Sequence, residues 1–293
     1  MDLFLKYAVM AVMLSCCTGF VADARTRDLS GKNVGIHMPE DTSREADSPF
    51  FRKDSVVVLL DSYFNNEKHK NKAGELVSSH YKWEQRDYGG YSRWGEVVRQ
   101  SGGAIRPSFL PPNYKTLSQA AVYIITDPDI PKENADARYM NETYARKIAT
   151  WVKKGGVLVL LGNDKGNADI RHFNLLAEKF GFLFNEDSYN KVPGRSFDPG
   201  EIFIKKGNPV FKKVRRVYIK ELATIKVIDK EVSTVLEKKG HVIAVKRHFG
   251  KGIVFAVGDP WFYNEYVNGR LPDTFDNEKA MRAFTNWMLS KAR

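Results

Sequence analysis

A short apolar strand that ends in a polar and aromatic cluster constrains the fold of this chain most strongly. Residues 253 to 257 (IVFAV) are apolar and partly β-branched, and glycines bound the run on both sides. This pattern is typical of a strand covered on both faces, as the parallel strands of α/β proteins are. The segment GDPWFYNE, residues 258 to 265, follows directly. Because ligands of open α/β sheets bind outside the carboxyl ends of the strands, we expect a site here.

Three further apolar runs end in polar residues in the same way, at residues 55–60, 120–126 and 157–161. Helical patterns over residues 91–101, 141–154, 170–180 and 277–291 separate or follow the strands. This alternation predicts a doubly wound α/β fold with a mostly parallel sheet, whose strand ends share one edge. The residues that we expect at this edge are Asp61, Ser62, Tyr63, Asp127, Asn163, Asp164, Asp259, Trp261, Tyr263 and Asn264.

The pattern loosens between residues 182 and 246, where glycine and proline interrupt short strand-like runs. These runs cover residues 201–205, 218–227 and 241–247. We predict that they are antiparallel additions to the sheet in the C-terminal half.

A segment between Gly74 and Gly103 is rich in aromatic residues and contains His80, Tyr81 and Trp83. Aromatic rings beside hydrogen-bonding groups suit sugars, because a pyranose has an apolar CH face and hydroxyls around its edge. The alternative is that these rings pack a helix onto the sheet. For the same reason, the turn residues and rings at 258–265 either bind a ligand or cap the core.

The first two dozen residues have the pattern of an export signal. An apolar run follows Lys6, and an A-x-A motif ends at Ala24. The run is too short for a membrane span of about 20 residues, so we predict no span and a periplasmic or secreted protein. A lipoprotein is the alternative, because the segment around Cys16 and Cys17 loosely resembles a lipid-attachment box. The predicted parts are a signal peptide (1–24), a polar leader or linker (25–53) and a single α/β domain (54–293).

The positions of the cysteines and the distribution of charge exclude several kinds of catalysis and binding for the predicted domain. Both cysteines lie in the predicted signal, so the domain holds neither a disulfide nor a thiol nucleophile. The formal net charge is +11, but the basic residues are scattered without a nucleic-acid recognition motif, and we predict no nucleic-acid partner. An exported basic surface suits an acidic, uronic-acid-rich glycan, although merely solvated lysines explain the same composition.

The order of strands and motifs resembles the class I glutamine-amidotransferase-like fold, which is also flavodoxin-like. In particular, it is similar to the uncharacterised domain of gut-type Bacteroidetes that occurs alone or fused to unsaturated rhamnogalacturonyl hydrolases. The resemblance covers residues 55–293 and implies a role in pectin-type polysaccharide degradation, without a catalytic assignment. The motifs that carry it are Asp61-Ser62-Tyr63, HYKWE at 80–84, GNDKGN at 162–167 and GDPWFYNE at 258–265.

The chain departs from true amidotransferases at the turn that holds their nucleophilic cysteine. The matching turn after Leu161 is Gly-Asn-Asp-Lys-Gly and has no thiol. A Gly-x-Ser-x-Gly elbow is also absent, so the sequence predicts neither glutaminase nor standard serine-hydrolase chemistry.

Two functions fit these observations. The first is a non-catalytic domain that binds acidic plant-type oligosaccharide, or assists a separate glycoside hydrolase, through Ser62, Tyr63, His80, Tyr81, Trp83, Asn163, Trp261, Tyr263 and Asn264. The second is a hydrolase of acidic oligosaccharides in which two carboxyl groups act as general acid and base. Its candidate catalytic residues are Asp61, Asp127, Asp164 and Asp259 for a glycoside bond, with His80 as proton carrier if the bond is an ester. We predict no metal and no cofactor, since no ligand pair has metal-binding helical spacing.

Overall fold

The centre of the protein is a seven-stranded sheet with the order β11-β12-β13-β6-β5-β1-β4. The computed structural model describes residues 55–194 and 196–292, which belong to one compact unit, Pro49–Arg293. The predicted signal, the linker and the two cysteines lie outside the described residues. The strands of the sheet are β1 (Val56–Asp61), β4 (Gly103–Ser108), β5 (Val122–Thr126), β6 (Val157–Leu161), β11 (Ser233–Lys238), β12 (His241–Phe249) and β13 (Gly252–Val257).

Five neighbouring strands, β4, β1, β5, β6 and β13, run parallel. β12 continues the sheet antiparallel to β13, and β11 pairs antiparallel with β12. This confirms the predicted α/β class, with a mostly parallel sheet and antiparallel additions in the C-terminal half. The chain places β4 on one side of β1 and β5, β6 and β13 on the other, which is the flavodoxin-like order. The topological switch point, where such folds bind ligands, therefore lies between β1 and β5.

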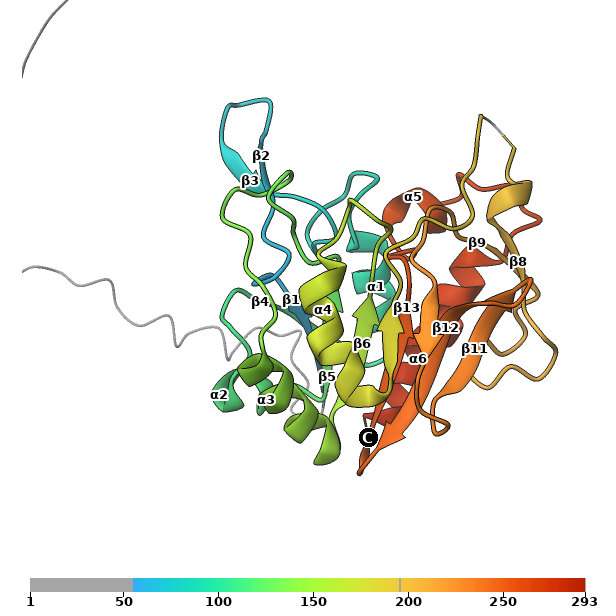
Figure 1. Cartoon of the computed structure of the whole chain (residues 1–293). Helices are drawn as coiled ribbons and strands as arrows, with labels where there is room; N and C mark the ends of the chain where they lie inside the picture. Colours follow the sequence, from blue (N-terminus) through green and yellow to red (C-terminus); the bar gives the residue numbers. More distant parts are fainter. Residues whose placement is uncertain (1–54, 195, 293) are drawn as a thin grey trace, which may run out of the picture. The chain divides into compact units, whose positions relative to one another are not determined.

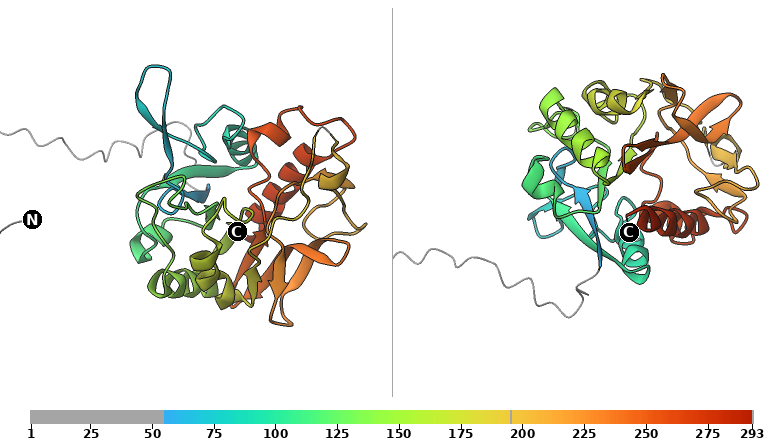
Figure 2. Two further views of the ribbon diagram at one scale, coloured as in Figure 1. Left: turned by 45° about the horizontal axis from the view of Figure 1, so that its top comes forward. Right: turned by 90° about the horizontal axis from the view of Figure 1, so that it is seen from below.

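Helices cover both faces of the sheet (Figures 1 and 2). One face packs against α1 (Ser92–Gln100) and α6 (Asn277–Lys291), and the other against α3 (Glu142–Lys153) and α4 (Ile170–Ala177). In β6, Val157, Val159 and Leu161 face the first core while Leu158 and Leu160 face the second. Because both faces of the central strands β5, β6 and β13 are buried, these strands are apolar at nearly every position rather than at alternate ones.

Short elements complete the chain and correct part of the prediction. The predicted runs at residues 201–205 and 218–227 are not strands of the main sheet. β8 (Glu201–Phe203) pairs with β9 (Arg216–Tyr218), and β10 (Ile225–Val227) pairs with β7 (Phe182–Phe184), in two separate two-stranded sheets. The buried segment between β9 and β10 turns at Glu221, where φ is 49°. The remaining elements are β2 (Lys68–Lys70), β3 (Leu76–Ser78), α2 (Tyr114–Leu117), η2 (Glu178–Phe180), β7 (Phe182–Phe184), η3 (Asp198–Gly200), β8 (Glu201–Phe203), β9 (Arg216–Tyr218), β10 (Ile225–Val227) and α5 (Asn264–Val267).

Among the described residues, no helix combines the length and apolar character needed to cross a membrane. This agrees with the prediction of no membrane span for this part of the chain.

Candidate functional site

The four predicted strand ends lie on one edge of the sheet. In the parallel register, Thr126 of β5 is opposite Leu161 of β6, and Leu161 is opposite Val257 of β13. Strand β1 ends at Asp61 in the same direction. We call the residues that follow these four strands, with the segments that cover them, the strand-end site.

Asp61 has a structural role at this edge. Its Oδ2 accepts hydrogen bonds from the backbone N–H groups of Phe64 (2.7 Å) and Tyr63 (3.1 Å), and its Oδ1 accepts one from the Tyr123 hydroxyl (2.6 Å). Burial raises the pKa of Asp61 to about 6, and these hydrogen bonds oppose the rise. Because both oxygens are occupied inside the protein, Asp61 closes the turn after β1 and does not face a ligand.

Asp127 and Asp129 lie at the switch point and each keeps a free oxygen. Asp127 is 4% exposed, Asp129 is 1% exposed, and Oδ1 of each has no hydrogen-bond partner. Burial raises the pKa of both carboxyl groups, while hydrogen bonds from Asn163 to Asp127 and from Asn134 to Asp129 lower it. An unsatisfied buried carboxyl oxygen is costly, so a ligand hydroxyl that donates to it would gain free energy.

A second pair of acidic residues extends this site toward the surface. The buried carboxylate of Glu67 accepts a hydrogen bond from Nδ1 of the exposed His80 at 2.9 Å, and this hydrogen bond raises the pKa of His80. Glu133 is half-buried, and its Oε2 has no partner. Burial, and then the nearby charge of Glu67, raises the pKa of Glu133 to about 7.

One buried cation balances these acids. Lys82 is 5% exposed, and burial lowers its pKa to about 8, although Asp61 and Asp129 oppose that shift. The residues at the switch point thus form one electrostatically connected group, which we call the switch-point group. Its members are Glu67, His80, Lys82, Asp127, Asp129 and Glu133.

Backbone strain coincides with the switch-point group. His80, Tyr81 and Asp127 have φ values of 52°, 55° and 44°. These values lie in the left-handed region, which residues other than glycine rarely adopt. Such conformations cost about 1 to 3 kcal/mol each and concentrate at functional sites. Three of them at one strand edge therefore support a functional role for this edge.

Asp164 and Asp259 form a separate pair at the ends of β6 and β13. Asp164 accepts hydrogen bonds from the Asn167 amide (2.6 Å) and the Ser188 hydroxyl, so both its oxygens are occupied. Burial raises the pKa of Asp259 well above its usual value, and the charge of Asp164 adds to the rise. Asp259 keeps a free Oδ1. Of the four predicted catalytic aspartates, Asp127 and Asp259 therefore retain unpartnered oxygens.

Four of the predicted ligand-binding rings divide into two half-buried and two buried ones. Tyr81 and Tyr263 are half-buried at the edge, with ring centroids 5.6 Å apart. Trp83 is 2% exposed and Trp261 is fully buried, so the prediction that they stack on a ligand is wrong. Trp83 packs against Tyr91 and Trp94, and Trp261 packs against Phe211 and Phe262.

Two of the other predicted ligand-binding residues, Asn264 and Tyr63, serve the fold. The Asn264 amide donates to Gln85 O, Asp87 O and Ser92 Oγ at 2.8 to 3.1 Å, which fixes the loop before α1. Tyr63 lies over the α3 face, where its hydroxyl meets that of Tyr144 at 3.4 Å. Ser62 is buried with an unpartnered hydroxyl. By contrast, Asn163 and His80 remain at the site, since Asn163 hydrogen-bonds Asp127 and His80 is exposed.

The sequence analysis did not select four members of the switch-point group: Glu67, Lys82, Asp129 and Glu133. Glu67 and Asp129 follow β1 and β5 closely, so the strand-end argument could have included them. Lys82 lies within HYKWE, but nothing in the sequence shows that its ammonium is buried. Among the residues that the structure describes, no group of three or more His, Cys, Asp or Glu side chains is arranged to hold a metal ion.

Comparison with known proteins establishes the fold alone. No family model matches the chain, and no curated protein matches it. Among solved structures, the mmIFT52 N-terminal domain is similar with a TM-score of 0.59 and 15% identity, over 80% of this chain and 97% of that one. Two cytoplasmic proteins of Salmonella typhimurium are also similar. STM1381 has a TM-score of 0.51 and 12% identity, over 80% of this chain and 97% of that one. STM3548 has a TM-score of 0.50 and 14% identity, over 80% and 98%.

Proposed function

We propose that the strand-end site binds the hydroxyl groups of an oligosaccharide, and that the protein is an exported, amidotransferase-like accessory domain of pectin-type polysaccharide degradation. The observation that carries the binding proposal is the set of buried carboxyl oxygens without partners at the switch point. They belong to Asp127, Asp129 and Glu133. The export and pectin parts of the proposal rest on the sequence resemblance and on the N-terminal pattern.

A sugar hydroxyl suits these oxygens because it donates one hydrogen bond and carries no charge. The accessible groups around them are the exposed His80 ring and the half-buried Tyr81, Asn163 and Tyr263. The tyrosine rings offer apolar faces to a pyranose, while the imidazole and amide offer further hydrogen bonds. The site thus combines acceptors, donors and ring faces on one edge.

The charge of the site modifies the expected ligand. Glu67, Asp127, Asp129 and Glu133 surround a single buried cation, Lys82. Any ionised acid of this group would repel a uronic carboxylate, and the repulsion is strong in a poorly solvated site. The strand-end site therefore takes the neutral, hydroxyl-bearing units of a plant-type oligosaccharide.

A hydrolase is the second candidate, and the titration behaviour of Glu133 favours it. With a pKa of about 7, Glu133 exists in both protonation states near neutral pH, as a general acid or base must. The His80–Glu67 pair lies close enough to influence this carboxyl group. In this mechanism Glu133 would donate the proton to the leaving oxygen, and an ionised carboxylate of the switch-point group would activate water or attack the sugar.

Calorimetry with a neutral galactan tetrasaccharide and a galacturonate tetrasaccharide tests the binding proposal. Asp127→Asn should weaken galactan binding about fivefold, which corresponds to one neutral hydrogen bond. Asparagine tolerates the left-handed backbone at this position, so the variant should stay folded. Asp136→Asn, an exposed change in the loop after β5, is the matched control and should bind as the unchanged protein does.

Two results would decide against the proposal. If galactan gives no binding heat, or if Asp127→Asn binds it normally, the strand-end site does not bind sugar hydroxyls. New reducing ends that form during the titration, and that Glu133→Gln abolishes, would establish the hydrolase instead.

A further inference from the structure

A cavity of about 470 Å³ lies at the other end of the sheet from the strand-end site. It is bounded by the start of β13 at Ile253, the end of β12 at His248 and the last turns of α6. Ile253 and His248 are register partners, which places the cavity at the amino end of β13. Volumes of roughly 300 to 1,000 Å³ are typical of sites for small ligands.

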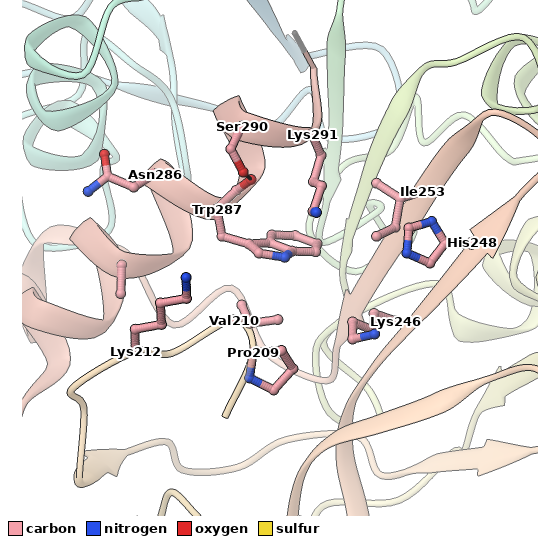
Figure 3. A pocket seen from close by; sticks show the side chains of 11 residues that line it. Pro209, Val210, Lys212, Lys246, His248, Ile253, Asn286, Trp287, Ser290 and Lys291 are labelled. Carbon is pink, nitrogen blue, oxygen red and sulfur yellow. Dashed lines mark hydrogen bonds between the residues drawn. The ribbon is translucent and has the colours of Figure 1, made fainter. Parts of the chain in front are cut away.

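The lining of this cavity is basic and contains no acidic residue. Lys212, Lys246, Lys291 and His248 surround the indole of Trp287, as Figure 3 shows. Within the part of the chain that the structure describes, none of these four side chains forms an ion pair or a side-chain hydrogen bond. Three lysines around one cavity repel one another, so a bound anion would relieve that repulsion.

Arg247, which lies between Lys246 and His248 on β12, has ion-pair partners among the described residues, unlike these two neighbours. Arg247 points to the opposite face, where its guanidinium meets Asp229 and Glu231, each at 2.8 Å. Lys246 and His248 flank it and face the cavity. Since alternate residues of a strand face opposite sides, β12 presents one ion-paired arginine on one face and, on the other, basic side chains without ion-pair partners in the described part of the chain.

Other cavities of the described chain also contain basic residues, but with acidic partners. The cavity lined by Arg93 also holds Glu278, which pairs with that arginine at 3.0 Å. The cavity lined by Lys279 holds Asp276, which pairs with it at 2.7 Å. The cavity beside Trp287 lacks such internal compensation, which points to an anion from outside the chain.

Trp287 adds a flat apolar surface to this cationic lining. The indole is half-buried, and it contacts the core through Phe255 and Phe284, at centroid distances of 5.8 and 5.7 Å. Its position among the lining residues leaves ring surface toward the cavity (Figure 3). Val210 and Ile253 contribute further apolar surface.

We propose that this cavity binds a uronic-acid oligosaccharide, with a pyranose CH face on Trp287 and carboxylates at Lys212, Lys246 and Lys291. The choice of an oligosaccharide rests on the proposed function, whereas the negative charge follows from the cavity alone. The chain would then hold neutral sugar units at the strand-end site and acidic units at the cavity.

Calorimetry of the full chain with a galacturonate tetrasaccharide, its methyl ester and inorganic phosphate tests this proposal. Trp287→Ala should weaken binding of the acid at least about tenfold, as is common for aromatic residues at binding hot spots. Lys246→Gln and Lys291→Gln should each weaken it about two- to fivefold and reduce its salt dependence. The methyl ester of the tetrasaccharide should bind the unchanged protein more weakly than the free acid does, because it lacks the negative charges. Lys72→Gln, an exposed change outside the cavity, should have no effect.

Several outcomes would overturn the proposal. They are normal binding of the acid by Trp287→Ala, equal affinity for the methyl ester, or phosphate binding as tight as tetrasaccharide binding. Trp287→Phe and circular dichroism check that a loss is not due to unfolding, since phenylalanine keeps a ring at this position. Asp127→Asn separates the two sites. If it abolishes binding of the acid while Trp287→Ala does not, the acid binds at the strand-end site, and both the cavity proposal and the proposed neutral specificity of that site fail. If the acid does not bind while galactan still binds through Asp127, only the cavity proposal fails.

Discussion

The ammonium group of Lys82 donates a hydrogen bond to the backbone carbonyl oxygen of Asn65 at 2.5 Å and another to the side-chain amide oxygen of the same residue. The Asn65 amide in turn donates to the backbone carbonyl of Asp127 at 2.8 Å. Asn65 therefore connects the buried cation to the strained residue that follows β5. All three residues are buried, so water cannot replace these contacts.

Asn65→Ala should lower the free energy of unfolding by about 2 to 4 kcal/mol, because it leaves the Lys82 ammonium and the Asp127 carbonyl short of buried partners. Urea denaturation measures this loss. Asn268→Ala, at an exposed position near α5, is the control and should change stability by less than about 0.5 kcal/mol. Equal free energies of unfolding for the two variants would show that the Lys82–Asn65 hydrogen bonds do not stabilise the fold.

The raised pKa of Asp61 predicts that the free energy of unfolding depends on pH. Its pKa is about 6 in the folded protein, against 3.8 for the free group. Its stabilising contribution is therefore complete below about pH 4 and is lost as the pH rises through 6. Relative to Asp61→Asn, the protein should lose about 3 kcal/mol of unfolding free energy between pH 4 and pH 8. Urea denaturation across this range measures the difference, and a constant difference would contradict the raised pKa.

Trp261→Ala should act on stability rather than on a binding surface. The ring is fully buried between Phe211 and Phe262, so its removal leaves a core cavity and should cost about 3 to 5 kcal/mol. Trp287→Ala should cost clearly less, because Trp287 is half-buried beside a cavity. Thermal or urea unfolding distinguishes them, and a Trp261→Ala variant as stable as the unchanged protein would contradict this placement.

Most of the fold could be predicted because the central parallel strands β5, β6 and β13 are apolar at nearly every position. Strand β6 and helix α6 begin and end at the predicted residues, Val157–Leu161 and Asn277–Lys291. Strand β4 was not predicted, since Gly103 and Pro107 do not resemble a strand. Proline is tolerated there because β4 is the edge strand of the sheet.

The location of the candidate site could be predicted from the sequence, but only some of the residues that form it could be. The strand-end rule located the edge, because parallel strands bring their carboxyl ends together. It could not show that the Trp83 and Trp261 rings point inward, because a turn after a strand has no fixed side-chain periodicity. It also could not show the left-handed backbone at Asp127, which depends on the packing of Asn65 and Asn163 around it.

Glu133 provides the last prediction, in which the direction of a pH profile separates binding from hydrolysis. Its pKa is about 7, raised by burial and then by Glu67. An ionised carboxylate accepts a stronger hydrogen bond from a sugar hydroxyl than a neutral carboxyl group does. If Glu133 binds sugar, the affinity for galactan should rise about fivefold from pH 6 to pH 8.

A general acid gives the opposite trend, because only protonated Glu133 can supply a proton, and turnover would fall as the pH rises through 7. Calorimetry and a reducing-end assay at pH 6, 7 and 8 measure the two trends on the same samples. Glu133→Gln should flatten whichever trend exists, whereas Glu84→Gln, at an exposed position, should preserve it. His80→Gln removes the imidazole whose charge acts on Glu133. Asp61 and Lys82, with pKa values of about 6 and 8, stay in both variants, so a trend that His80→Gln preserves and Glu133→Gln flattens belongs to Glu133. Galactan affinity that is independent of pH in the unchanged protein would show that the Glu133 carboxylate does not contact the ligand.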